Sequence, residues 1–216
     1  RICKMSKGFF ITFEGGEGSG KTTQVELLYN NLKQRGFNVT RTREPGGTIL
    51  AESIREILLK GEKDKMDSLT ELYLFAAARK DHIDNIIAPS LKNNEIVICD
   101  RFIDSTTAYQ GYAGNIDLNI INSINNFTIG SIIPNITYIF DIDPNIGLKR
   151  SFNTTSEEIR FEEKDIGYHK KIRSGFLEIA KNNSDRCIVI DAEQELEKIE
   201  EFLLNLTIKK YEDNGK

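Results

Sequence analysis

Short apolar runs alternate with longer stretches of helical periodicity along most of the chain. The apolar runs are rich in isoleucine, valine and phenylalanine, and we expect each to form a buried strand, at residues 9–14, 39–43, 96–100, 136–141 and 187–191. Between them, apolar residues recur every three or four positions, which predicts helices at residues 21–34, 50–59, 68–92, 118–125, 168–182 and 193–209. This order is typical of a doubly wound α/β fold with a five-stranded parallel sheet.

The pattern predicts one domain over residues 5–210, since 216 residues suffice for a single α/β core. We interpret Met5 as the natural start, so that residues 1–4 lie upstream of it. The polar tail at residues 211–216 is expected to fray. Polar residues interrupt the pattern within residues 147–166, and we expect this segment to act as a lid over a bound ligand.

Composition narrows the class of protein. A net charge of −4, with 39% hydrophobic and 29% charged residues, indicates an ordinary globular chain and argues against a nucleic-acid partner. The three cysteines are scattered, which does not suit a disulfide framework or a zinc site. No apolar stretch has the length of a membrane span and no signal peptide is recognisable, so we expect a cytoplasmic protein without a membrane partner. The two histidines, His82 and His169, stand in no catalytic pattern.

The most informative motif is a phosphate-binding loop. Residues 15–22 match G-x-x-x-x-G-K-[ST], between a predicted strand and a predicted helix. In that context backbone N–H groups and the helix N-terminus bind a polyphosphate, Lys21 reaches its β- and γ-phosphates, and Thr22 binds Mg²⁺. The alternative is a glycine-rich turn without a ligand. The residues predicted to bind ATP are Gly15, Gly16, Glu17, Gly18, Ser19, Gly20, Lys21, Thr22 and Thr23.

Charged residues also follow two other predicted strands, at the edge where open α/β sheets bind ligands. Asp100 ends the third strand, where it could organise Mg²⁺ together with Thr22. Arg101 comes next and suits bidentate capture of a phosphate, although an internal salt bridge is the alternative. Arg43 ends the second strand, just before a Pro-Gly-Gly turn.

An aromatic residue and a cation share one face of the long predicted helix. Phe75 and Arg79 are four residues apart, and the residues between them are alanines. Such a pair could stack on a base and hold its phosphate. This spacing more commonly reflects a phenylalanine in the core beside a solvated arginine. The small alanines between them, however, favour the close approach of a ligand.

Taken together, these segments resemble the thymidylate kinase family, which phosphorylates dTMP to dTDP with ATP. The resemblance extends from Phe9 to the last helix, and the segments that carry it are residues 13–23, 42–48, 75–79, 100–110, 147–150 and 160–162. It implies the three-layer fold of P-loop nucleoside monophosphate kinases, Mg²⁺ as cofactor, and a homodimer.

The resemblance also implies roles for single residues. Phe75 stacks on thymine, and Arg79 and Arg101 grip the dTMP phosphate. Tyr109 crowds the sugar 2′ position, and Glu17 binds the 3′-hydroxyl or a nearby metal. The implied dTMP-binding residues are Glu17, Arg43, Pro45, Arg55, Phe75, Arg79, Arg101, Thr106, Tyr109 and Gln110. The implied catalytic residues are Glu17, Lys21, Arg101 and Arg160, and the implied metal ligands are Thr22 and Asp100.

A lid arginine completes the implied machinery. Ser19 stands where some relatives carry a loop arginine, so the chain resembles the bacterial branch in which the lid supplies this charge. We expect Arg160 to be this arginine and keep Arg150 as a second candidate, because Ile159 stands where many relatives place an acid. In the first case Arg160→Ala lowers kcat steeply with little change in dTMP affinity.

Two alternatives remain at this point. Another nucleotide or nucleoside kinase is the nearest, although deoxynucleoside kinases usually show Glu-Arg-Ser where this chain has Asp100, Arg101 and Phe102. The other is a non-catalytic nucleotide-binding switch, but the Asn-Lys-x-Asp motif of GTPases is not found. The sequence leaves the tolerance for dUMP open.

Overall fold

Five parallel strands form the single sheet of the computed structural model, which describes residues 8–151 and 160–214. The strands are β1 (Phe9–Gly15), β2 (Val39–Arg43), β3 (Ile96–Asp100), β4 (Ile136–Asp141) and β5 (Cys187–Asp191). Their order across the sheet is β2-β3-β1-β4-β5, and every neighbouring pair is parallel. The predicted five-stranded parallel sheet is therefore confirmed.

The central strand shows why these sequences read as unbroken apolar runs. Phe9, Ile11 and Phe13 of β1 point to one face of the sheet, where they pack with α1 (Lys21–Gln34) and α9 (Leu196–Asn214). Phe10 points to the other face and joins a separate core cluster. Since both faces are covered, every position of β1 is buried and no polar alternation remains.

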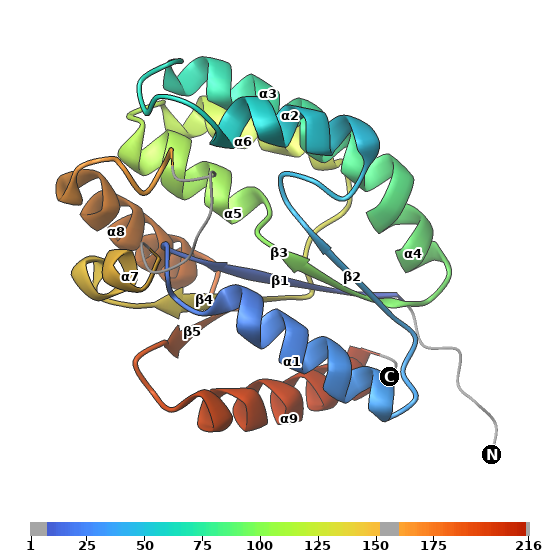
Figure 1. Cartoon of the computed structure of the whole chain (residues 1–216). Coiled ribbons are helices and arrows are strands. Elements are labelled where there is room, and N and C mark those ends of the chain that lie inside the picture. The colour runs from blue at the N-terminus through green and yellow to red at the C-terminus, as the bar shows by residue number, and fades with distance from the viewer. Residues whose placement is uncertain (1–7, 152–159, 215–216) are drawn as a thin grey trace.

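The remaining helices cover the opposite face and the ends of the sheet (Figure 1). They are α2 (Ile49–Leu59), α3 (Ser68–His82), α4 (Ala88–Lys92), α5 (Ile103–Thr106), α6 (Leu118–Ile129), α7 (Pro144–Ser151) and α8 (Ile166–Asn182). Two π-helical stretches, η1 (Ile83–Ile87) and η2 (Thr107–Ala113), continue α3 and α5. Helix α2 packs on α3 through a small core of its own, outside the layer next to the sheet.

The helix predicted over residues 68–92 is interrupted by η1. Pro89 lies in the first turn of α4, just after η1. A proline ring clashes with the carbonyl four residues earlier in a regular helix, and the wider π turns accommodate the chain at this point.

The chain terminus is more ordered than predicted. Helix α9 runs to Asn214, so the part of the tail at 211–214 is helical. The Tyr211 ring meets the rings of Phe9 and Phe37 edge-on, with centroids 5.6 and 5.5 Å apart. These contacts partly bury the Tyr211 ring, which the polar composition of the tail did not reveal. Residues 1–4 and 215–216 lie outside the described residues.

None of the described helices combines the length and the apolar character needed to cross a bilayer.

Candidate active site

The loop after β1 has the conformation that its glycines allow. Gly18 and Gly20 both have positive φ angles, and α1 begins immediately after Gly20. The Lys21 ammonium folds back over the loop, where it donates to the Gly16 carbonyl at 2.6 Å and to Ser19 Oγ at 3.0 Å. Burial, helped by the charge of Arg101, lowers the pKa of Lys21 to about 8. A nearby anion would favour the charged form of this lysine.

Helix α7 lies directly against the loop because two glycines meet there. A Cβ on Gly18 would come within 1.9 Å of the Gly147 carbonyl oxygen, and a Cβ on Gly147 within 2.4 Å of the Glu17 carbonyl oxygen. Only glycine allows this approach, which brings the next turn of α7, with Arg150, to the rim of the loop. The Arg150 side chain is exposed there and uses one N–H on the Ala192 carbonyl, at 3.3 Å.

Two oxygen-bearing side chains meet beside the loop. Thr22 Oγ1 donates to Asp100 Oδ2 at 2.7 Å, although the two residues are 78 positions apart in the sequence. Parallel β1 and β3 place them together, since Thr22 lies in the first turn of the helix after β1 and Asp100 ends β3. Hydroxyl and carboxylate oxygens are ligands that suit Mg²⁺.

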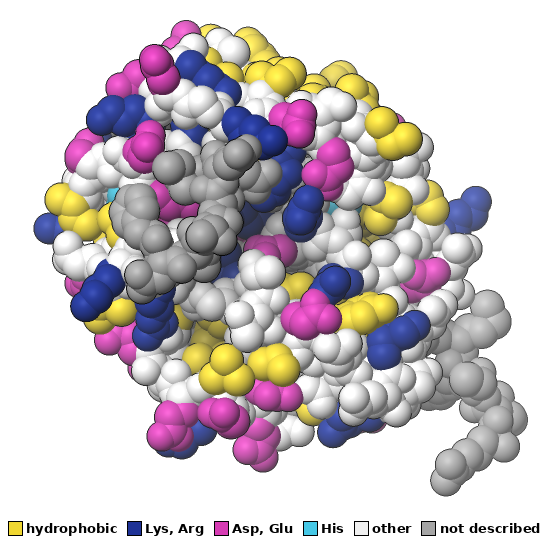
Figure 2. Space-filling view, viewed as in Figure 1, with side chains coloured by type: hydrophobic (Ala, Val, Ile, Leu, Met, Phe, Trp, Pro, Cys, Tyr) yellow, Lys and Arg dark blue, Asp and Glu magenta, His cyan; other side chains and the backbone are white. Residues whose placement is uncertain are grey.

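Two cavities open at this edge of the sheet. The first, which we call the loop cavity, has a volume of about 540 Å³ and is lined by the phosphate-binding loop, Arg43, Asp100, Arg150 and Ser151. The second, the side cavity, has a volume of about 240 Å³ and runs between the helices of the opposite face. Figure 2 shows Lys and Arg side chains gathered around a hollow in this part of the surface. The cavities are adjacent and have a common wall, because they share the lining residues Glu17, Glu44, Arg55 and Arg101.

The structure brings together nearly all of the residues singled out in the sequence. Those predicted to bind ATP line the loop cavity from Glu17 to Thr23. Of those implied for dTMP, Arg43 lines the loop cavity, and the others all line the side cavity: Glu17, Pro45, Arg55, Phe75, Arg79, Arg101, Thr106, Tyr109 and Gln110.

Arg101 stands at the common wall of the two cavities. Its guanidinium donates to both carboxylate oxygens of Glu17 at 3.0 Å and to the Gly15 carbonyl at 2.9 Å, and it lies over the Tyr109 ring. Burial alone would raise the pKa of Glu17, but the charges of Arg101 and Lys21 outweigh it and the pKa is lowered. Both partners are therefore charged, and the internal salt bridge considered from sequence exists at the cavity wall.

A buried carboxyl group holds Arg101 in an unusual backbone conformation. Arg101 has a φ angle of 70°, in the left-handed region. Glu14, which is fully buried, accepts from the next backbone N–H, that of Phe102, at 2.7 Å, and from Ser105 Oγ. Burial and the nearby Asp104 raise the pKa of Glu14 to about 7. Its role was not recognised in the sequence, where it reads as the last residue of a strand.

Arg79 is buried more deeply than a solvated helix arginine would be. Only 2% of its surface is exposed, and its guanidinium donates to Glu44 at 2.7 Å, to the Phe102 carbonyl at 3.1 Å and to Asn125 at 3.3 Å. The guanidinium therefore already has three protein acceptors at the wall of the side cavity.

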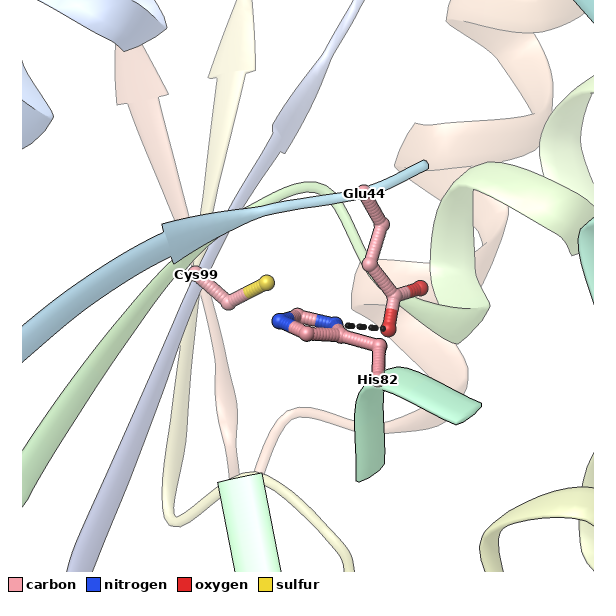
Figure 3. Close-up of side chains that lie close together, drawn as sticks. All are labelled: Glu44, His82 and Cys99. Atoms are coloured by element: carbon pink, nitrogen blue, oxygen red, sulfur yellow. Dashed lines mark hydrogen bonds and ion pairs between the residues drawn. The ribbon is translucent and has the colours of Figure 1, made fainter. Parts of the chain in front are cut away.

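Glu44 is itself held by His82, on the side of the carboxylate away from Arg79. Figure 3 shows His82 beside this carboxylate, with Cys99 close to the imidazole ring. His82 Nδ1 lies 3.0 Å from Glu44 Oε1, and His82 Nε2 lies 2.6 Å from Thr42 Oγ1. Both carboxylate oxygens of Glu44 and both ring nitrogens of His82 thus have protein partners, and the cluster fixes Arg79 in place.

Arg160, the expected lid arginine, lies in the interior of the part of the chain that the structure describes. Its side chain is fully buried and lines neither cavity. The guanidinium donates to Glu71 at 2.6 Å, and the carbonyls of Leu58, Glu62 and Met66 accept at 3.1 to 3.4 Å. In this arrangement its donors are used to tie the chain to the end of α2 and the start of α3, away from the phosphate-binding loop. The central part of the expected lid, residues 152–159, lies outside the described residues.

The residues after Arg160 complete the side cavity. Phe161 packs against Tyr109, with ring centroids 5.6 Å apart, and Glu162 lines the same space. Burial and repulsion by Glu17 raise the pKa of Glu162 to about 7. No role was predicted for either residue, and their position directly after Arg160 was the one available signal.

Comparisons with known proteins agree on one family. The family model for thymidylate kinase matches residues 13–203. A thymidylate kinase of Caulobacter vibrioides is 43% identical over 95% of this chain and 99% of its own length. One from a Sulfurihydrogenibium species is 47% identical, over 92% of this chain and 96% of its own. The crystal structure of thymidylate kinase from Ehrlichia chaffeensis superposes with a TM-score of 0.73 at 42% identity, covering 94% of this chain and 98% of that one.

Proposed function

Since this chain belongs to the thymidylate kinase family, we propose that its two adjacent cavities hold ATP and dTMP end to end for transfer of the γ-phosphoryl group. The observation that carries the proposal is the shared wall of Glu17 and Arg101 between the loop cavity and the side cavity. A triphosphate on the loop would there meet a monophosphate that enters with its base in the side cavity.

The loop cavity is the proposed ATP site. Its backbone and the N-terminus of α1 receive the phosphates, and Lys21 exchanges the Gly16 carbonyl for a phosphate oxygen. Thr22 and Asp100 would hold Mg²⁺, which supplies positive charge against the phosphates when bound. We infer that the rest of the work of this site is alignment and charge neutralisation.

The side cavity is the proposed dTMP site. The second pKa of a phosphate is about 6, so the acceptor oxygen is already ionised near neutral pH and needs no general base. Arg101 faces this phosphate at the junction, and Phe75 offers a half-buried ring for the base farther in. We propose that Arg79 contacts dTMP at the cavity wall between the base and the phosphate. Glu44 balances the charge of Arg79 there.

We propose that Arg150, and not Arg160, supplies the additional positive charge at the transferred group. Arg150 is exposed at the rim of the loop cavity, whereas Arg160 is buried with four acceptors around it. Repulsion between two anionic phosphates is the main obstacle to the reaction, and an arginine at the rim reduces it.

We further propose a homodimer that forms through α2, α3 and α6. These helices pack together and leave large apolar side chains exposed, including Ile49 and Phe127, each 91% exposed. Figure 2 shows hydrophobic side chains gathered along the edge over α2 and α3. A second copy of the same face would bury them in a two-fold interface. Sedimentation equilibrium should give the mass of a dimer, and Phe127→Asp should shift it to the monomer; a monomeric wild type would contradict the proposal.

Turnover tests the proposed reaction. Purified chain with ATP and Mg²⁺ should convert dTMP to dTDP, and AMP, GMP and thymidine should give far lower rates in the same coupled assay. Formation of no dTDP, or equal use of thymidine, would contradict the proposal.

A further inference from the structure

One buried carboxylate links Arg160 to the floor of the side cavity. Glu71 of α3 is 4% exposed. Its Oε1 accepts from Arg160 at 2.6 Å, and its Oε2 accepts from Gln110 Nε2 at 2.9 Å. Gln110 lies in η2 and lines the side cavity, whereas Glu71 itself does not. Neither the glycine loop nor the arginines at the cavity junction involve this contact.

The carboxylate determines which way the Gln110 amide points. A carboxylate only accepts hydrogen bonds, so the NH₂ group of Gln110 is the end that can face Glu71. The amide oxygen is thereby turned away from Glu71. The charge of Arg160 keeps the carboxylate paired on its other side, so that Glu71 is not left as a lone buried charge.

The oxygen that Glu71 turns away is an unused acceptor. Gln110 Oε1 is buried and has no hydrogen-bond partner among the residues that the structure describes. An unsatisfied buried acceptor is unfavourable, and a ligand that brings an N–H group to it removes that cost. Because Gln110 lines the side cavity, a base bound there is the group placed to supply the N–H.

We propose that Glu71, anchored by Arg160, is a positioning residue that fixes Gln110 as an acceptor and so selects a pyrimidine base whose N3 carries an N–H group. The inference rests on the proposed function for the identity of the site. Thymine and uracil carry such a group at N3, whereas N3 of cytosine is itself an acceptor. A cytosine ring would bring one acceptor to another, and a site built around a hydrogen bond discriminates strongly against a ligand that cannot make it.

Arg160 acquires a different role in this scheme from the one expected of a lid arginine. It binds no phosphate, but the carbonyls of Leu58 and Glu62 hold it against Glu71. Loss of Arg160 should therefore change the affinity for the base more than it changes the rate of transfer.

The test is a comparison of binding constants for dTMP and dCMP, measured by calorimetry on the full chain and its variants. Glu71→Gln replaces the obligate acceptor by an amide that can also donate, which lets the Gln110 amide turn over. We expect dTMP binding to weaken about tenfold or more, dCMP binding to hold or improve, and kcat for dTMP to fall less than its KM rises. Both dissociation constants of a variant are measured on the same preparation. A partly unfolded fraction therefore affects the two constants equally and cancels in their ratio.

Two further variants separate positioning from simple support of the fold. Gln110→Ala should show the same loss of preference, and adding Glu71→Gln to it should cause no further loss, because Glu71 acts through the missing amide. Asp104→Asn is the matched control, since Asp104 is 3% exposed, pairs with Arg186 at 2.7 Å and lines neither cavity. It should lower the thermal midpoint without changing the ratio of dTMP to dCMP affinity.

Glu71→Asp covers the case in which Glu71→Gln does not fold. It keeps the charge opposite Arg160 but withdraws the acceptor from Gln110 by one methylene, and should reduce the preference in the same direction, by less. A wild-type ratio in a folded Glu71 variant, or a further loss in the double variant, would overturn the inference while leaving dTMP phosphorylation intact. Conversely, a wild type that prefers dTMP through Glu71 but makes no dTDP would refute only the reaction.

Discussion

The arginines in and near the two cavities differ in how far each side chain is exposed to solvent. At the loop cavity, the Arg43 side chain is 54% exposed, Arg101 is 20% exposed, and Arg150 lies on the surface. Arg79, at the wall of the side cavity, is 2% exposed, and Arg160, which lines neither cavity, is fully buried and pairs with Glu71. One molecule thus uses the same residue type in two ways.

Desolvation explains the difference. A buried guanidinium is stable only with its donors satisfied, so it becomes part of the architecture. An arginine at an open rim is hydrated and can exchange water for phosphate oxygens. Exposure therefore separates the arginines that can bind a phosphate from those that hold the cavity in shape.

The largest expected effect is on stability, at the buried pair of Arg160 and Glu71. Arg160→Met leaves the Glu71 carboxylate unpaired in the interior, and removal of one partner of a buried pair costs about 3–5 kcal/mol. Urea denaturation should show this loss in the free energy of unfolding. Adding Glu71→Gln should recover part of it, because the lone charge is then gone. A loss below about 1 kcal/mol would mean that the pair is not buried as described.

At the loop cavity, Lys21→Met should lower activity without lowering stability. Removing one preorganised donor lowers kcat by about 10²–10³ in comparable sites. Burial lowers the pKa of Lys21 to about 8, so its charge at pH 7 opposes folding and its removal should not lower the thermal midpoint. Steady-state rates and thermal denaturation of the same sample check both statements. A large drop in the midpoint would place Lys21 with the structural cations.

The buried Glu14 should make the free energy of unfolding depend on pH. Its pKa is raised from 4.5 to about 7, so the folded state binds the proton more tightly than the unfolded chain. The stability that it contributes is full below pH 4.5 and is lost as the pH rises through about 7. Relative to Glu14→Gln, the wild type should therefore lose about 2–3 kcal/mol between pH 5 and pH 8. Parallel curves of unfolding free energy against pH for the two proteins would refute a buried acid at this turn.

The smallest expected effect concerns the base. Stacking of a base on an aromatic ring is worth about 1–3 kcal/mol, so Phe75→Ala should weaken dTMP binding by roughly 5- to 150-fold, with a smaller change in kcat. Calorimetry measures it directly. Phe202→Ala, in α9 on the other face of the sheet, is the control and should leave the dissociation constant unchanged. An unaltered constant in the Phe75 variant would argue against stacking.

The sequence predicted the strands and the phosphate-binding loop because these depend on local pattern. Glycine spacing, a preceding apolar strand and a following helix suffice to place Lys21 and Thr22. Parallel strands then bring Asp100 to the same edge, which the expected topology also implied.

The hydrogen-bond partners of buried polar side chains could not be predicted from local sequence patterns. Nothing in the order of residues shows that Arg160 meets Glu71, 89 positions away, or that Glu14 supports Arg101 from below. The expectation that Arg160 serves as a lid arginine came from the resemblance to the family, whereas its burial depends on packing against α2 and α3. The same holds for Tyr211, whose ring partners Phe9 and Phe37 are far from it in the sequence.

The most direct test of the division between rim and interior is kcat at saturating ATP, dTMP and Mg²⁺ for Arg150→Ala beside Arg160→Met, each corrected for the folded fraction. An arginine at the transferred phosphoryl group can be worth on the order of 10³ or more in rate. We predict a loss of that size for Arg150→Ala, with dTMP affinity and thermal midpoint close to those of the wild type, and a much smaller loss of kcat for Arg160→Met. Near-normal turnover of Arg150→Ala together with a thousandfold loss in folded Arg160→Met would contradict the account.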